Sequence, residues 1–212
     1  YRNKEARAQK LVESIEASGG TAIAVGADLT DPVGVARMMG SIKERWGGLD
    51  LLILNASGGM EADMGEDYAM KLNRDAQVGL LMSALPLMER GARVVFVTSH
   101  QAHFIREVET MPEYVPVALS KRAGEDALRG MNDQMKSLGI DFVVVSGDMI
   151  EGTVTATLLN RANPGVIDQR KEQVGKLYNV DEFAAEVALA AVEDIPDDHT
   201  RLVGDISSFQ TS

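Results

Sequence analysis

An apolar run near the middle of the chain, Arg93-Val94-Val95-Phe96-Val97-Thr98, predicts a β-strand. It lacks the alternation of polar and apolar residues that marks a half-exposed strand, so it indicates a strand buried on both faces, as in a parallel sheet covered by helices. Further strands are predicted at 21–26, 49–54, 141–145 and 201–203.

Helical patterns separate these strands, over 4–18, 32–46, 67–90, about 116–138 and 181–193. Strands that alternate with helices predict βαβ units, and hence an α/β fold: a three-layer αβα, doubly wound parallel sheet of the Rossmann type. Such sheets bind ligands at the carboxyl ends of their strands. The least regular stretches each follow a strand and are the candidate substrate loops, at 56–66, 100–115 and 147–180.

Bulk composition narrows the function classes. The 212 residues fit one domain with a sizeable core. A net charge of -11 with scattered basic residues predicts no binding to nucleic acid or to an anionic membrane. No apolar run approaches the ~20 residues that span a bilayer. The absence of cysteine excludes disulfides and thiolate metal sites and suits a reducing cytoplasm. We therefore predict a cytoplasmic protein that acts on a small molecule and holds no metal.

A lysine closes the stretch Pro116-Val117-Ala118-Leu119-Ser120-Lys121, which follows the strand that runs on into Ser99. A serine at the end of a strand, followed by a lysine near the start of a helix, resembles the active-site element of the short-chain dehydrogenase/reductase family. The family pattern is Tyr-x-x-x-Lys, whereas the tyrosine position here holds Val117.

The resemblance extends over nearly the whole chain from residue 21. Asp28-Leu29 stands where the family places an aspartate and an apolar residue against the adenine of the cofactor. Leu54-Asn55-Ala56-Ser57 resembles the family's Asn-Asn-Ala-Gly turn: it keeps the second asparagine and the alanine and replaces the other two residues. The resemblance thus implies that Asp28, Leu29, Asn55, Ala56 and Ser57 bind a nicotinamide dinucleotide.

Further matches lie later in the chain. Asn73 resembles the helical asparagine that supports a water beside the catalytic lysine, Ser99 the serine that holds the substrate oxygen, and Lys121 the lysine that grips the nicotinamide ribose. Gly147 resembles a remnant of the Pro-Gly turn beside the nicotinamide, and Thr153 is a candidate for its amide.

The choice of cofactor depends on Arg2. It follows what resembles the end of the family's second strand, where a basic residue favours the 2′-phosphate of NADP. We predict NADP, with NAD as the alternative. The sequence contains no Gly-x-x-x-Gly-x-Gly phosphate turn and enters a helical pattern almost at once, so we expect a further segment before Tyr1.

The proton donor is the open point in the sequence. Hydride transfer to a carbonyl leaves charge on its oxygen, which a general acid within ~3 Å must neutralise. Val117 has no proton to give. Tyr114 lies roughly 10 Å from Lys121 along a helix axis, so its position does not favour it. The possible substitutes are Tyr114, His100, His103, or a water relay from Ser99 to Lys121.

The resemblance implies a single dinucleotide-binding oxidoreductase domain over 1–212. It implies an NADP-dependent enzyme that transfers a hydride between the nicotinamide and a small carbonyl or alcohol, with Ser99, Lys121 and Asn73 in the catalytic set. We add Tyr114 to this set as a substitute proton donor. It also implies a homodimer or homotetramer built on the helices at about 70–90 and 116–138. Because the motif tyrosine is missing, the alternative is a catalytically impaired sensor or scaffold that binds the dinucleotide.

Overall fold

The computed structural model describes residues 1–60, 65 and 67–210. Within them, a parallel sheet has the strand order β1-β2-β3-β4 and consists of β1 (Leu51–Leu54), β2 (Arg93–Ser99), β3 (Asp141–Gly147) and β4 (Thr200–Val203). The two central strands pair over their full length, so Ser99 is paired with Gly147 at the carboxyl edge. The predicted strands at 49–54, 93–98, 141–145 and 201–203 therefore exist.

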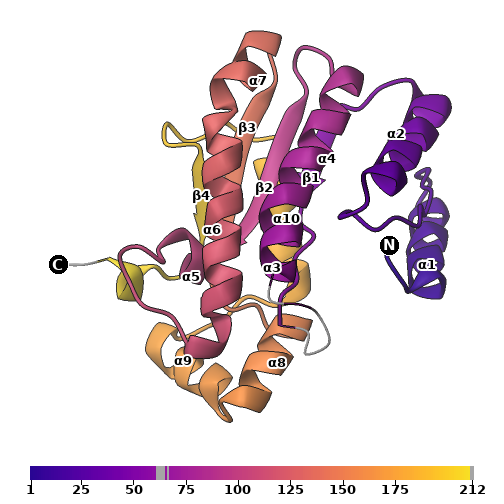
Figure 1. Cartoon of the computed structure of the whole chain (residues 1–212). Coiled ribbons are helices and arrows are strands. Elements are labelled where there is room, and N and C mark those ends of the chain that lie inside the picture. The colour runs from indigo at the N-terminus through magenta and orange to yellow at the C-terminus, as the bar shows by residue number, and fades with distance from the viewer. Residues whose placement is uncertain (61–64, 66, 211–212) are drawn as a thin grey trace.

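Helices cover both faces of the sheet, which confirms the predicted fold class (Figure 1). One layer contains α2 (Pro32–Trp46), α4 (Ala76–Ala84), α6 (Val115–Gly130) and α7 (Asn132–Leu138), and the other contains α10 (Val180–Ala190). Alternate residues of β2 and β3 face opposite layers: Val94, Phe96, Phe142 and Val144 one way, and Val95, Val97, Val143 and Val145 the other. Both faces are buried, so neither strand has a polar side.

The N-terminal region lies beyond β1, with α1 (Glu5–Ala17) away from the sheet (Figure 1). The predicted strand at 21–26 is wrong, because the structure forms no strand over these residues. Among the described residues, Tyr1 bonds to this segment: the Tyr1 nitrogen donates to the Val25 carbonyl at 3.0 Å, and the Ala27 amide donates to the Tyr1 carbonyl at 2.9 Å. Two such bonds place Arg2 beside Asp28 without forming a strand.

Two predicted helices are subdivided. The pattern at 67–90 becomes α3 (Tyr68–Met70), a π-helical segment (Lys71–Asp75), α4 and a 3₁₀ turn (Leu85–Leu87). The pattern at 116–138 begins at Val115, with Pro116 in the first turn, and is interrupted at Met131 between α6 and α7.

The predicted loops contain short helices: α5 (His100–His103), a 3₁₀ turn (Pro112–Tyr114), α8 (Val154–Ala162) and α9 (Val166–Val174). Local caps form the starts of two of them, since the Ala102 amide donates to Ser99 Oγ and the Ala156 amide to Thr153 Oγ1. Residues 61–64 and 66 of the loop predicted at 56–66 lie outside the described residues.

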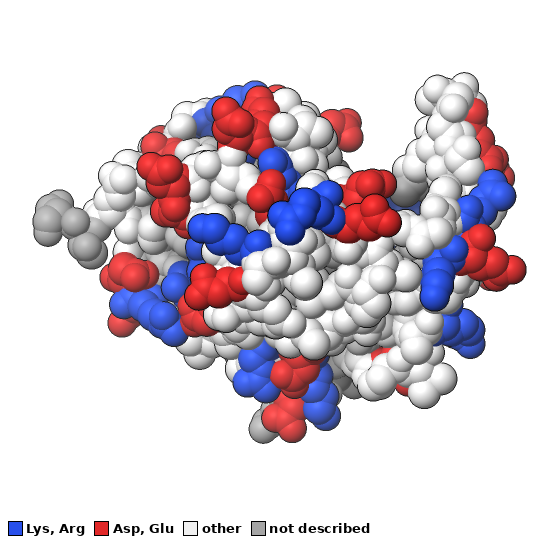
Figure 2. Space-filling model, turned by 90° about the horizontal axis from the view of Figure 1, so that it is seen from above, with Lys and Arg blue, Asp and Glu red and all other residues white. Residues whose placement is uncertain are grey.

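The surface carries mixed charge. On the face in Figure 2, Lys and Arg side chains lie among Asp and Glu side chains. In the part of the chain that the structure describes, no helix is both long enough and apolar enough to cross a bilayer, and no group of three His, Asp or Glu side chains could hold a metal ion.

Candidate active site

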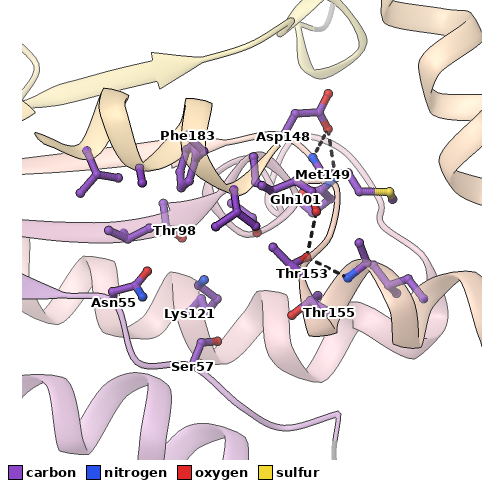
Figure 3. Close-up of a pocket in the computed structure, with 18 of the residues that line it drawn as sticks. Asn55, Ser57, Thr98, Gln101, Lys121, Asp148, Met149, Thr153, Thr155 and Phe183 are labelled. Carbon is purple, nitrogen blue, oxygen red and sulfur yellow. Dashed lines mark hydrogen bonds between the residues drawn. The ribbon is translucent and has the colours of Figure 1, made fainter. Parts of the chain in front are cut away.

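A cavity of about 510 Å³ lies at the carboxyl ends of β1, β2 and β3 (Figure 3). Side chains from several elements line it, among them Asn55, Ser57, Thr98, Ser99, Gln101, Tyr114, Lys121, Asp148, Met149, Thr153, Ala156, Leu159 and Phe183. The parallel sheet brings these separate segments to one edge, which is where such sheets bind ligands.

Ser99 and Tyr114 form a hydrogen-bonded pair in this cavity. Their hydroxyl oxygens lie 3.1 Å apart, and Ser99 Oγ also accepts from the Ala102 amide at 3.3 Å. Tyr114 is buried. Burial raises the pKa of Tyr114, and the hydrogen bond with Ser99 opposes that rise. A phenol that is protonated at neutral pH thus stands beside the serine.

The position of Tyr114 corrects the expectation that its geometry is unfavourable. The 3₁₀ turn Pro112–Tyr114 leads directly into α6, so Tyr114 is held at the start of the helix rather than in a free loop. Its ring belongs to a buried cluster that contains Met149, Ala156 and Leu159. The distance along the helix from Lys121 therefore does not prevent both residues from lining the same cavity.

The other sequence candidates for the proton donor do not line the cavity. His100 is fully buried, its Nδ1 lies 2.8 Å from Ser146 Oγ, and burial lowers its pKa to about 4. His103 faces α6, where its Nδ1 lies 2.9 Å from a carboxylate oxygen of Glu125. Neither imidazole is placed to protonate a substrate beside Ser99.

Lys121 projects from α6 into the cavity (Figure 3). Burial lowers its pKa to about 8. Among the described residues, no carboxylate forms an ion pair with it. Its ammonium group is therefore available to a ligand.

Asn73 lies behind the cavity rather than in its wall. Its Nδ2 donates to the Gly58 carbonyl at 2.8 Å and to Ser120 Oγ at 2.9 Å, and its Oδ1 accepts from the Gly58 amide at 3.1 Å. These bonds join the loop after β1 to α6, one residue before Lys121. Asn73 is thus brought close to Lys121 through Ser120, but its side chain is fully occupied with protein partners.

A second cavity, of about 490 Å³, contains the predicted adenosine residues. Ser57 lines both cavities, and the second is also lined by Arg2, Asp28, Leu29 and Ala56. A shallow hollow beside it is lined by Arg2, Asn3, Asp28 and Arg37, among others. The nine predicted cofactor residues except Gly147 therefore line adjoining cavities.

Arg2 and Asp28 each make hydrogen bonds within the protein. The Arg2 guanidinium donates to the Tyr68 hydroxyl, and its Cζ lies 5.7 Å from the centre of that ring. Asp28 accepts from the Thr30 hydroxyl at 2.7 Å and the Thr30 amide at 2.9 Å, which lowers its pKa. The residues present fit the two ends of a dinucleotide: Lys121, Asn55 and Thr153 at one, Arg2 and Asp28 at the other.

Gly147 and Thr153 have local structural roles. A Cβ on Gly147 would lie 2.4 Å from Cε2 of Phe183, so glycine permits α10 to approach β3. Gly147 itself does not line the cavity, unlike Thr153. The Thr153 hydroxyl donates to the Ile150 carbonyl at 2.8 Å while accepting from the Ala156 amide.

Sequence reasoning missed several residues that line this cavity, including Gln101, Asp148, Met149 and Phe183. Asp148 carried a signal that could have identified it, because an aspartate directly after a buried strand lies at the ligand edge of the sheet. Phe183 carried none, since only the three-dimensional approach of α10 to Gly147 places it there.

Comparison with known proteins identifies the family. The family model for short chain dehydrogenases matches residues 1–163. The chain belongs to the short chain dehydrogenase family. This membership confirms the resemblance that the motifs indicated.

Curated members of the short chain dehydrogenase family align with different portions of this chain. A 1-cyclohexenylcarbonyl-CoA reductase from Streptomyces collinus is 30% identical over 71% of this chain and 54% of its own length. A versicolorin reductase 1 from Dothistroma septosporum is 27% identical over 96% of this chain and 76% of its own length. The chain spans a little over half the length of the first two curated relatives that it matches, at 54% and 58%.

Solved structures of family members share the fold. A short chain dehydrogenase from Burkholderia cenocepacia in complex with NADP has a TM-score of 0.76 and 26% identity, over 97% of this chain and 84% of that one. The angucycline C-6 ketoreductase LanV with bound NADP has a TM-score of 0.74 and 26% identity, over 98% and 82%.

Proposed function

We propose that this chain forms the catalytic domain of an NADP-dependent reductase that converts a small carbonyl compound to an alcohol, with Tyr114 as the general acid. The single observation that carries this proposal is the 3.1 Å separation of the Tyr114 and Ser99 hydroxyl oxygens in a cavity that also contains Lys121. In this proposal Tyr114, three positions before Val117, takes the role of the tyrosine that the family pattern has at position 117.

Ser99 and Tyr114 have separate roles at the substrate oxygen. Ser99 donates a hydrogen bond that positions the carbonyl oxygen, and Tyr114 transfers its proton to that oxygen as charge develops. Because burial raises the pKa of Tyr114, its hydroxyl keeps its proton at neutral pH. This protonation state suits reduction, since oxidation of an alcohol requires a base at the same place. Solvent then returns the proton to the phenolate.

The remaining residues are assigned to the cofactor. A bound nicotinamide dinucleotide supplies the hydride. Lys121 would donate hydrogen bonds to its ribose, and Thr153 and Asn55, which line the same cavity, would hold the nicotinamide end. Arg2, next to Asp28, offers a positive charge to a 2′-phosphate, which is why we propose NADP rather than NAD. The NADP complexes of the Burkholderia cenocepacia enzyme and of LanV support this choice.

The relatives suggest the kind of reaction. Several of their names describe reductases, among them versicolorin reductase and an angucycline ketoreductase, which supports carbonyl reduction here. The same proposal includes a cytoplasmic location and assembly into a homodimer or homotetramer through α4 and α6. Each of these helices exposes a large apolar side chain, Met82 at 48% and Leu119 at 51%. Light scattering coupled to size-exclusion chromatography would measure the assembly.

Replacement of Tyr114 by phenylalanine tests the mechanism. Tyr114→Phe removes one hydroxyl from the cavity and should lower kcat by about 10²- to 10⁴-fold, the usual contribution of a general acid, with NADPH affinity retained. The matched control is Tyr178→Phe, the same change at a tyrosine that does not line the cavity. NADPH consumption on a panel of ketones and aldehydes gives the readout.

Two results would contradict the proposal in different ways. Full activity of Tyr114→Phe would remove Tyr114 from the role of general acid while leaving the enzyme a reductase. NADPH binding by the wild-type protein without turnover of any carbonyl would instead support the alternative, a dinucleotide-binding sensor or scaffold.

A further inference from the structure

A buried ion pair borders the cavity: Asp148 lines it, and its partner Arg170 does not. Asp148 follows β3 directly, and Arg170 reaches it from α9. Arg170 Nε donates to both carboxylate oxygens, at 3.2 and 2.9 Å, and its Nη2 lies 2.8 Å from Oδ2. The two side chains are only 5% and 10% exposed. An aspartate that would otherwise make this wall negative is therefore neutralised by a cation that solvent barely reaches.

The guanidinium of Arg170 is held in place from its other side. Its Nη1 donates to Ser208 Oγ at 2.8 Å, and its Cζ lies 5.3 Å from the centre of the Phe209 ring. On the carboxylate side, Asp148 Oδ1 also accepts from the Met149 amide at 2.7 Å. Both charges are thus fixed by several contacts, and Arg170 cannot turn into the cavity without breaking them.

In the part of the cavity wall that the structure describes, no other charge is free for a substrate. Met149, Ala156 and Leu159 are apolar and belong to the buried cluster that contains the Tyr114 ring. Apart from Asp148, Tyr114 and Lys121, the described residues that line the cavity carry no ionisable side chain. Tyr114 is neutral, and Lys121 is assigned to the cofactor ribose. A charged group on the substrate would therefore lose its water without gaining a partner.

We propose that the Asp148–Arg170 ion pair is a specificity determinant that keeps the substrate wall neutral, so that the cavity accepts an uncharged carbonyl compound with an apolar body and rejects one that carries a carboxylate. This inference rests on the proposed carbonyl reduction, because it assigns the substrate of that same site. Specificity against the charged analogue arises from the absence of a compensating group rather than from a clash.

A matched pair of ketones tests the inference: methyl 4-acetylbenzoate and 4-acetylbenzoate, which differ mainly in one negative charge. The wild-type protein should favour the ester over the acid by at least about tenfold in kcat/KM. Asp148→Asn keeps the shape of the side chain and leaves the Arg170 charge uncompensated, so the ester-to-acid ratio should fall by about tenfold or more.

The neighbouring residue on α9 provides the control. Lys171 pairs with Glu151 at 2.6 Å, but its side chain is 40% exposed and the pair does not line the cavity. Lys171→Gln should leave the ester-to-acid ratio within about twofold of the wild type, because exposed ion pairs contribute little. A wild-type protein that accepts the acid as well as the ester would overturn the inference, as would an Asp148→Asn ratio equal to that of the wild type.

Loss of folding in Asp148→Asn would not leave the inference untested. Arg170→Met leaves the negative charge of Asp148 uncompensated, so it should shift the kcat/KM preference toward 4-acetylbenzylamine, the cationic analogue. An unchanged preference would contradict the proposal.

Saturation-transfer NMR measures ligand binding separately from turnover. If the ester binds, the acid does not, and neither is reduced, the neutral cavity is supported while the proposed reduction fails. Equal binding of ester and acid overturns the inference whether or not reduction occurs.

Discussion

Val117 of α6 lies against Gly59 in the loop after β1. A Cβ on Gly59 would lie 3.3 Å from a methyl group of Val117 and 2.5 Å from Cβ of Ala69. Val117 is 3% exposed and does not line the cavity. The helix position that carries the family's tyrosine is therefore occupied by a close apolar contact, and the hydroxyl beside Ser99 comes from Tyr114 instead.

Restoring the family motif should therefore not improve this protein. Val117→Tyr inserts a ring into a contact that has no room for it, and overpacking of this kind costs roughly 1–3 kcal/mol. We expect a lower urea midpoint and no gain in NADPH-dependent turnover. Val117→Ala shortens the same side chain, and its urea midpoint shows whether removing methyl groups here destabilises the protein less than adding a ring. A rise in activity of Val117→Tyr by an order of magnitude would show that Tyr114 does not fill the role proposed for it.

Gly124 should be intolerant of a side chain. A Cβ there would stand 2.1 Å from the carbonyl oxygen of Asn73, so α6 and the π-helical segment would have to separate. We expect Gly124→Ala to lower the free energy of unfolding by about 3 kcal/mol. Gly130→Ala in the same helix meets nothing within 4 Å and should be neutral or stabilising by up to about 1 kcal/mol. Equal urea midpoints for the two variants would contradict the close approach.

His100 should make stability depend on pH in a defined window. Burial lowers its pKa to about 4, whereas in the unfolded chain it is near the usual value of about 6.5. Between these values the unfolded state binds a proton that the folded state does not, so stability falls as the pH falls from 6.5 toward 4, by roughly 3 kcal/mol in total. Urea titrations from pH 7 to 5 measure the slope.

His100→Gln provides the comparison for this slope. It removes the titrating group, so its free energy of unfolding should change less over the same interval, whatever its absolute stability. Burial raises the pKa of Glu125, but its contacts with His103 and Arg129 together lower that pKa below the usual value, so Glu125 loses its contribution at more acidic pH and does not obscure the window. Identical slopes for wild type and variant would rule out a neutral, buried His100.

Lys121 should make cofactor affinity decline in mild alkali. Its pKa of about 8 means that the ammonium is charged at pH 7 and largely neutral at pH 9. We expect the Kd for NADPH to rise a few-fold over this interval. Lys121→Arg keeps its charge throughout and should bind with little change between the two pH values. Fluorescence titration of bound NADPH provides the measurement, and parallel pH profiles would indicate that another group controls the affinity.

The sequence predicted the sheet well because burial on both faces leaves a local trace. Strands β2 and β3 are buried on both faces, so each appears in the sequence as an apolar run that can be recognised without knowing which segments pack against it. The segment 21–26 carries the same local preference, yet it forms no strand, and among the described residues its backbone bonds are with Tyr1. Strand propensity depends on a partner that composition cannot reveal.

The candidate site was predicted less completely for a related reason. Ser99 and Lys121 could be found because each has a fixed place after a strand or in a helix. The position of Tyr114 beside Ser99 depends on a 3₁₀ turn that joins α6 without a break, whereas Pro116 had indicated that the helix begins after Tyr114. Arg170 lies 22 residues from Asp148 in the chain, and nothing in their spacing predicts that the two side chains meet.

The π-helical segment Lys71–Asp75 makes this part of the chain tolerant of a change in length. A π turn contains about one residue more than an α turn, so deleting one residue there would let the helix continue in regular α form. The later side chains of α4 would then keep nearly the same direction relative to Tyr68, and Leu80 and Leu81 would stay in the core. The same deletion within the regular turns of α4 would rotate every later side chain by about 100°. A single-residue deletion should thus be less damaging to the packing of the helix within this segment than in α4.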